Sequence, residues 1–142
     1  MKIKIFTLLF GIILISCNTK ASKEREIKKT VTKFLNAVER DDKKEGRELI
    51  YNSKHFYGGI NMELSFFHKN YKKINSYIDL KNNIKVKDTI YLLGQKFKYV
   101  QYHIKNSNDS LKPLMITFIF YDQVGYDKIY NCCIFNNMLD WE

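Results

Sequence analysis

The chain has 142 residues, of which 45% are hydrophobic, 15% aromatic and 27% charged, and its formal net charge is +9 at pH 7. This balance is typical of a globular protein and excludes collagen-like and intrinsically disordered chains. The length favours a single domain, which at this size buries about two-thirds of its unfolded surface. The positive charge does not indicate a nucleic-acid partner, because the lysines are spread along the chain and only Arg25, Arg40 and Arg47 are arginines.

The N-terminus has the pattern of an export signal. Lys2 and Lys4 precede an apolar run from residue 5 to residue 15 that carries no charge. The run is too short to span a bilayer comfortably and has the form of the hydrophobic region of a secretory signal. It ends in Leu-Ile-Ser-Cys at residues 14–17, which resembles the lipobox of bacterial lipoproteins. The alternative is an ordinary N-terminal membrane anchor that is never cleaved.

The resemblance to a lipobox implies a membrane-attached protein. Residues 1–16 would be a cleaved signal peptide, and Cys17 would become the acylated first residue of the mature chain. Two or more acyl chains hold a protein firmly in a bilayer. We therefore expect the protein in the bacterial cell envelope, outside the cytoplasm, with residues 17–23 as a tether and residues 24–142 as one domain.

Basic residues gather beside the expected anchor. They are Lys20, Lys23, Arg25, Lys28 and Lys29, opposed by Glu24 and Glu26. We hypothesise that this cluster rests on anionic lipid headgroups, because basic residues next to a membrane anchor are attracted to a negative membrane surface. The alternative is a solvated helix face.

The first half of the mature chain predicts helices. Residues 22–40 carry one apolar stripe at helical spacing, and residues 61–75 carry a second. The first stripe consists of Ile27, Val31, Phe34, Leu35 and Val38, and the second of Leu64, Phe67, Tyr71, Ile74 and Ile78, the last of which falls beyond the expected helix end at residue 75. Each stripe predicts a helix with one buried face.

A short helix is expected between these two. Asp42 is its expected N-cap, with Glu45 reaching back to complete a capping box, and residues 49–51 are its apolar part. Gly46 lies inside this helix, where glycine costs about 1 kcal/mol of helix propensity. Residues 52–60 are expected to form a loop that is flexible at its pair of glycines.

From residue 84 onward the apolar residues recur with a period of two, which predicts strands. The expected strands are residues 84–87, 97–104, 114–121 and 126–136, the third of them buried on both faces. Turns are expected at residues 106–110 and 122–125. Consecutive strands joined by short turns pair antiparallel. The chain is therefore expected to be α+β, with about three N-terminal helices packed on a curved, mostly antiparallel sheet of about four long strands.

Residues 31–38 read Val-Thr-Lys-Phe-Leu-Asn-Ala-Val, an acidic break follows at residues 40–42, and the expected strands form a meander. This combination resembles the nuclear transport factor two-like superfamily over residues 24–136. The resemblance implies a cone-shaped α+β domain with a pocket between the helices and the concave face of the sheet, and a homodimer formed through the exposed sheet. Isomerases, dehydratases, transport adaptors and accessory domains share this fold, so the fold does not give the function.

The resemblance directs attention to the residues that would line that pocket. The candidates are Phe34, Tyr71, Tyr99, His103, Phe118 and Phe120. The alternative is that these side chains are plain core. A pocket enzyme would also need a carboxylate or a histidine as general base. The acids of the strand region all fall at expected strand ends or turns, where aspartate is a common turn former: Asp79, Asp88, Asp122 and Asp127. We therefore assign no catalytic residue.

The histidines and cysteines indicate neither a metal nor a cofactor. His55, His68 and His103 lack the compact spacing of metal ligands. Cys132 and Cys133 are neighbours in an expected strand, so their side chains point to opposite faces. We expect one thiol in the core and the other on the second face, and the alternative is a strained vicinal disulfide.

Three functions remain open. The first is an accessory lipoprotein of the cell envelope that binds a small ligand or a partner protein through the pocket between sheet and helices. The second is an immunity or inhibitor lipoprotein that acts by protein–protein contact through an exposed aromatic and lysine-rich surface. The third is a pocket enzyme of the isomerase or dehydratase kind, which would need a buried carboxylate or histidine beside a tyrosine hydroxyl.

Overall fold

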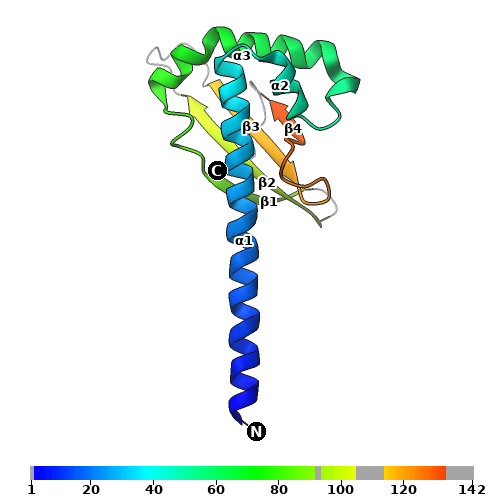
Figure 1. Cartoon of the computed structure of the whole chain (residues 1–142). Helices are drawn as coiled ribbons and strands as arrows, with labels where there is room; N and C mark the ends of the chain where they lie inside the picture. The colour runs from blue at the N-terminus through cyan, green and yellow to red at the C-terminus, as the bar shows by residue number, and fades with distance from the viewer. Residues whose placement is uncertain (1, 92–93, 105–113, 134–142) are drawn as a thin grey trace.

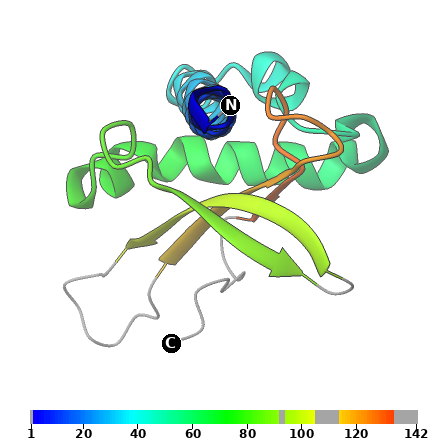
Figure 2. The ribbon, with the colours of Figure 1, turned by 90° about the horizontal axis from the view of Figure 1, so that it is seen from below.

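The protein folds as a layer of helices on one face of an antiparallel sheet. The structure, a computed structural model, describes residues 2–91, 94–104 and 114–133. Its elements are, in chain order, α1 (Lys2–Glu39), α2 (Lys43–Glu48), the 3-10 helix η1 (Ser53–Phe56), α3 (Tyr57–Tyr77), β1 (Val86–Tyr91), β2 (Gln95–Ile104), β3 (Leu114–Tyr121) and β4 (Asn131–Cys133). The expected α+β class is confirmed, since the helices precede the strands and cover one face of the sheet (Figures 1 and 2).

The longest helix, α1, carries the first predicted stripe. All five residues of that stripe are buried in the core, which confirms this prediction. The helix ends at Glu39, one residue before the expected end, but it begins at Lys2 instead of at residue 22. Its N-terminal part extends well beyond the rest of the domain (Figure 1).

The short helix α2 is fixed by a cap and by close contact with α3. Asp42 Oδ1 accepts a hydrogen bond of 2.9 Å from the backbone N–H of Glu45, so the predicted N-cap is confirmed. The Glu45 carboxylate pairs with Arg40 at 2.5 Å instead of completing a capping box. Gly46 is buried, and a Cβ atom built on it would lie only 3.1 Å from Leu64 Cδ2. The glycine therefore allows α2 and α3 to approach closely.

The apolar residues 49–51 lie beyond α2, and their prediction as part of that helix is wrong. Ile50 instead forms an isolated parallel β-bridge with Ile129. The N–H of Tyr51 donates to the carbonyl of Ile129, and the N–H of Ile129 donates to the carbonyl of Leu49, both at 2.8 Å. Because these backbone groups bond to Ile129, α2 does not continue through residues 49–51. The two bonds also link the helical half of the chain to the segment between β3 and β4.

The second stripe lies on α3, which begins before the expected residue 61. The segment 52–60, predicted as a loop, holds η1 and the first turn of α3, including Gly58 and Gly59. Asn52 adopts a φ of 52°, a left-handed conformation that asparagine tolerates better than most residues, and it turns the chain into η1. Four of the five residues of the predicted stripe are buried in α3, and Ile78 lies just beyond the helix as its C-cap, partly buried against the core.

The strands lie in the order β1-β2-β3-β4 and every neighbouring pair is antiparallel. Residues of β2 and β3 face each other in register, with Val100 opposite Phe118 on the face toward the helices. Phe97 and Tyr121 are paired on the other face. The predicted alternation along β2 and the predicted bounds of β3 are thus confirmed.

The outer strands depart from the prediction. β1 starts at Val86 and continues to Tyr91, so Asp88 lies inside a strand and not at a strand end. An edge strand tolerates polar residues such as Asp88. The alternation of apolar residues in the sequence therefore does not reveal the full length of β1. Residues 126–130 form no strand because this stretch turns toward residues 49–51, and β4 is confined to Asn131–Cys133. The expected turn at residues 106–110 and the end of the last expected strand, residues 134–136, lie outside the described residues.

Candidate functional site

The space between sheet and helices, where the sequence predicts a pocket, is filled by aromatic side chains. Phe34 from α1 meets Phe118 from β3 edge-to-face at 5.3 Å between ring centroids, and Phe67 from α3 lies 6.5 Å from Phe34. Tyr102 also meets Phe118 edge-to-face, at 6.3 Å between ring centroids, and its hydroxyl donates to the carbonyl of Leu80 at 2.8 Å. Phe118 and its neighbours are fully buried, so this interior is core.

The structure does not bring the six predicted pocket residues together. Phe34, Phe118 and Phe120 are fully buried in the core, and Tyr71 joins them from α3, where burial raises the pKa of its hydroxyl. The two remaining candidates lie on the opposite face of the sheet. Tyr99 is buried there under Lys87, whose Nζ lies 5.9 Å from its ring, and exposed His103 contacts Gln101 at 3.2 Å.

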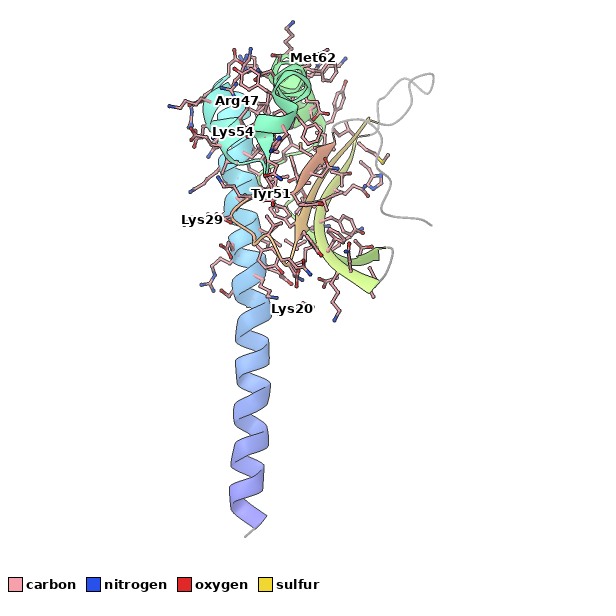
Figure 3. The ribbon with its side chains drawn as sticks, turned by 90° about the vertical axis from the view of Figure 1, so that its right-hand side faces the viewer. Lys20, Lys29, Arg47, Tyr51, Lys54 and Met62 are labelled. Atoms are coloured by element: carbon pink, nitrogen blue, oxygen red, sulfur yellow. The ribbon has the colours of Figure 1, made fainter. Side chains whose placement is uncertain are left out.

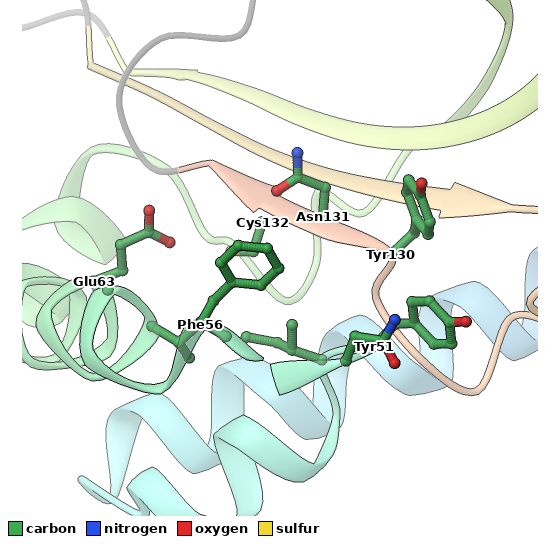
Figure 4. Close-up of a pocket in the computed structure, with 10 residues that line it drawn as sticks. Tyr51, Phe56, Glu63, Tyr130, Asn131 and Cys132 are labelled. Atoms are coloured by element: carbon green, nitrogen blue, oxygen red, sulfur yellow. The ribbon is translucent and has the colours of Figure 1, made fainter. Parts of the chain in front are cut away.

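A hollow of about 510 Å³ opens elsewhere on the surface, between the start of α3 and the edge strand β4 (Figure 4). Its lining consists of Ile50, Tyr51, Asn52, Phe56, Gly59, Ile60, Glu63, Tyr130, Asn131 and Cys132. These residues come from two segments of the chain, residues 50–63 and residues 130–132. The bridge between Ile50 and Ile129 positions the two segments, because Tyr51 and Tyr130 directly follow the bridged residues.

One wall of this hollow is aromatic. Tyr51 and Tyr130 stack with their ring centroids 5.9 Å apart and an interplanar angle of 24°. The Tyr130 ring also contacts Tyr121 at 5.5 Å and Phe97 at 6.0 Å between ring centroids. Phe56, which stands in the hollow in Figure 4, is 69% exposed. The wall is therefore anchored in the sheet, but it leaves a large apolar ring open to solvent.

Among the described residues of the lining, Glu63 is the charged one, and it projects from the second turn of α3. Its side chain is partly buried, and loss of hydration raises the pKa of the carboxyl above its ordinary value. Among the described residues, Glu63 forms neither an ion pair nor a hydrogen bond through its carboxylate. The neighbouring cation Arg47 is engaged elsewhere, since it donates to Asn61 Oδ1 at 2.6 Å and stacks on the Tyr57 ring at 4.7 Å.

The floor of the hollow includes Cys132, which is 7% exposed and belongs to the core. The alternative of a vicinal disulfide stays a prediction, because it depends on the side chain of Cys133. The expectation that one cysteine fills the core is confirmed for Cys132. The side chain of Cys133 lies outside what the structure describes.

The basic cluster predicted beside the anchor is divided by the fold. Lys23 pairs with Asp122 at 3.4 Å, and Lys20 lies 3.9 Å from Asp88, so both turn toward the sheet. Asp88 also binds Lys98, and this contact holds the pKa of the carboxyl below its ordinary value. The remaining three residues of the cluster, Arg25, Lys28 and Lys29, are exposed. The side chain of Cys17 lies outside what the structure describes.

The histidines have structural or solvent-exposed environments. His68 Nδ1 donates to the carbonyl of Val38 at 2.8 Å, which links α3 to the end of α1, while His55 is exposed. Within the described part of the chain, no three histidine, cysteine, aspartate or glutamate residues gather in a group that could hold a metal ion. The described helices also include none with the length and apolar character needed to cross a membrane.

The hollow was not among the sites proposed from sequence. Tyr51 was expected inside a helix and Phe56 inside a loop, and no local pattern joins them to Tyr130. A usable signal was present in α3, where Met62 and Phe66 lie off the buried stripe and are 76% and 39% exposed. Apolar residues outside the stripe of an amphipathic helix indicate a contact surface. Comparison with family models, with curated proteins and with solved structures gives no match for this chain.

Proposed function

We propose that the protein is a bacterial lipoprotein of the cell envelope, attached to the membrane through acylated Cys17, that binds a partner protein at the surface hollow. The observation that carries this proposal is the open aromatic hollow beside a filled interior. Phe56 is 69% exposed at a concave site, whereas the space that a small ligand would need between sheet and helices is occupied by aromatic rings. Exposed apolar surface at a concave site favours a protein contact.

The apolar surface continues from the hollow onto α3. Phe56 is followed by Tyr57 at 56% exposure and Met62 at 76%, and Phe66 extends the surface by one helical turn. Figures 1 and 3 show this end of the domain opposite the N-terminus of α1. At 1.5 Å per residue, α1 rises roughly 33 Å between Cys17 and its last turn. An anchor at Cys17 would thus hold the hollow away from the membrane, where a partner can reach it.

Membership in the nuclear transport factor two-like superfamily is part of the same proposal. The order of helices before a four-stranded antiparallel meander supports it. An accessory role suits this chain better than catalysis, because the described interior holds packed aromatic rings in place of a carboxylate or histidine beside a ligand space. The first function proposed from the sequence left open whether the lipoprotein binds a small ligand or a partner protein. We propose a partner protein.

A second candidate, an immunity or inhibitor lipoprotein, is favoured by the cations that flank the apolar surface. Arg47 covers the Tyr57 ring at 4.7 Å, and Lys54 lies in η1 next to this surface (Figure 3). Tyrosine and arginine are common in the few residues that dominate a protein–protein contact. In this version the partner is a toxin or a hydrolase, and binding at the hollow neutralises it.

Site-specific photo-crosslinking in the producing bacterium tests the proposal. The full-length protein would carry p-benzoylphenylalanine in place of Phe56, or in place of Lys29 or Ile90 as controls. Lys29 is exposed on α1 and Ile90 is 70% exposed on β1, and neither lines the hollow.

We expect one adduct of defined mass from position 56, lost when Tyr51 is replaced by alanine, and none from the two controls. Equal adducts from all three positions, or none from position 56, would contradict the proposal. An adduct of twice the mass of the protein would identify a second copy of this chain as the partner.

A further inference from the structure

We infer that the hollow receives a single positively charged side chain, lysine or arginine, from the partner protein, with its carbon chain against Phe56 and its charge at Glu63. This inference deepens the proposed function and rests on it. It concerns the chemistry of the bound group, which the aromatic wall alone does not specify.

The charge of the lining supports a cation. Glu63 is the one charged residue in the described part of the lining, and no described lysine or arginine pairs with it. Two other glutamates of the domain have cationic partners: Glu39 binds Lys81 at 2.6 Å and Glu45 binds Arg40 at 2.5 Å. A partly buried carboxylate without a partner costs folding free energy, and a chain with nine excess positive charges has many cations to place beside it. The unpaired state of Glu63 is therefore explained if a cation arrives from outside.

The aromatic wall fits the rest of such a side chain. Lysine and arginine carry three or four methylene groups below the charge, which pack on apolar surface while the charged group reaches a polar one. An ammonium or guanidinium group is also attracted to the face of an aromatic ring. Phe56, which is largely exposed, offers such a face within the same hollow as Glu63 (Figure 4).

The surroundings favour one cationic side chain over a polybasic segment. Arg47 contacts Asn61 and Tyr57 at the start of α3, and Lys54 lies in η1 beside Phe56, so each would repel further positive charge brought by the partner. The hollow is open to solvent, and at about 510 Å³ it is large enough for a side chain that projects from a larger surface. Its affinity for the isolated group should be weak, with a Kd on the order of 1 mM.

Saturation-transfer difference NMR on the full-length protein in detergent micelles tests the inference. The probes are the capped tripeptides Ala-Lys-Ala and Ala-Arg-Ala, with Ala-norleucine-Ala as an uncharged control and pentylammonium as a free cation. The variants are E63Q and, as a matched control, E26Q, because Glu26 is exposed on α1 outside the hollow. We expect saturable binding of both cationic tripeptides, weaker by about tenfold in E63Q and unchanged in E26Q.

Three results would overturn the inference. They are equal binding of the norleucine tripeptide, equal affinities of the wild type and E63Q, and binding of pentylammonium without binding of the tripeptides. Two further outcomes distinguish a failure of this inference from a failure of the proposed function. If the adduct from position 56 persists in E63Q, a partner still docks at the hollow but not through a cationic side chain. If the cationic tripeptides bind but the adduct is absent, the hollow takes a cation without docking a partner protein.

Discussion

The close approach of α2 and α3 at Gly46 gives a prediction whose sign depends on the neighbouring side chain. A Cβ atom on Gly46 would lie 3.1 Å from Leu64 Cδ2 and 3.3 Å from Cδ1, and Leu64 is 4% exposed. The G46A substitution gains about 1 kcal/mol of helix propensity, but overpacking a buried site costs about 1–3 kcal/mol. We expect G46A to destabilise the protein by about 0–2 kcal/mol.

The L64A substitution removes the two methyl groups that Gly46 faces. Alone it should cost about 2–5 kcal/mol, because a buried leucine leaves a cavity. In the L64A background the added methyl of G46A meets no obstacle, so it should stabilise the protein by about 0.5–1 kcal/mol through propensity. Urea-induced unfolding followed by circular dichroism measures all four free energies of the double-mutant cycle. The reasoning is refuted if G46A has the same effect in both backgrounds.

Three further predictions concern the buried bond to the β3–β4 segment, the carboxylate of the hollow and the anchor. Thr30 Oγ1 donates a buried hydrogen bond of 2.7 Å to the carbonyl of Tyr126, so T30V should lower the free energy of unfolding by about 1–3 kcal/mol, and a loss below 0.5 kcal/mol would contradict this. Burial raises the pKa of Glu63 above its ordinary value of 4.5. The folded protein therefore holds this proton more tightly than the unfolded chain, and the free energy of unfolding falls as the pH rises from 4.5 through the raised pKa. The E63Q variant should therefore be more stable than the wild type at pH 7, with a gain that disappears below pH 4.5, and a gain independent of pH would contradict the assignment. The C17S variant should lose labelling by palmitate and leave the membrane fraction, and continued labelling would contradict acylation at Cys17.

Much of the fold was predictable because it depends on local patterns. The helical stripe of α1 and the alternation along β2 each follow from the spacing of apolar residues within one element. The cap at Asp42 likewise depends on a contact three residues away. Gly46 shows what local patterns cannot predict. In the sequence this glycine only weakens a helix, whereas the structure explains it by the close approach of Leu64, which belongs to another helix.

The candidate site was not predictable, because it is assembled by long-range contacts. The bridge between Ile50 and Ile129 joins stretches that are far apart in the chain and brings Tyr51 beside Tyr130. Aromatic residues occur on both faces of the sheet, so the alternation could not tell that Phe118 faces the helices while Tyr99 does not. A buried aromatic residue and a pocket-lining one have the same pattern in a sequence, and only their packing separates them.

The central claim is that recognition takes place in the surface hollow and depends on the charge of Glu63. The most direct test is the yield of the photo-adduct from position 56, measured in whole cells for the wild type, E63Q and E26Q. We predict a strong adduct in the wild type and in E26Q, and a yield about tenfold lower in E63Q. Equal yields in all three proteins, or an adduct from position 90 as strong as that from position 56, would contradict the account.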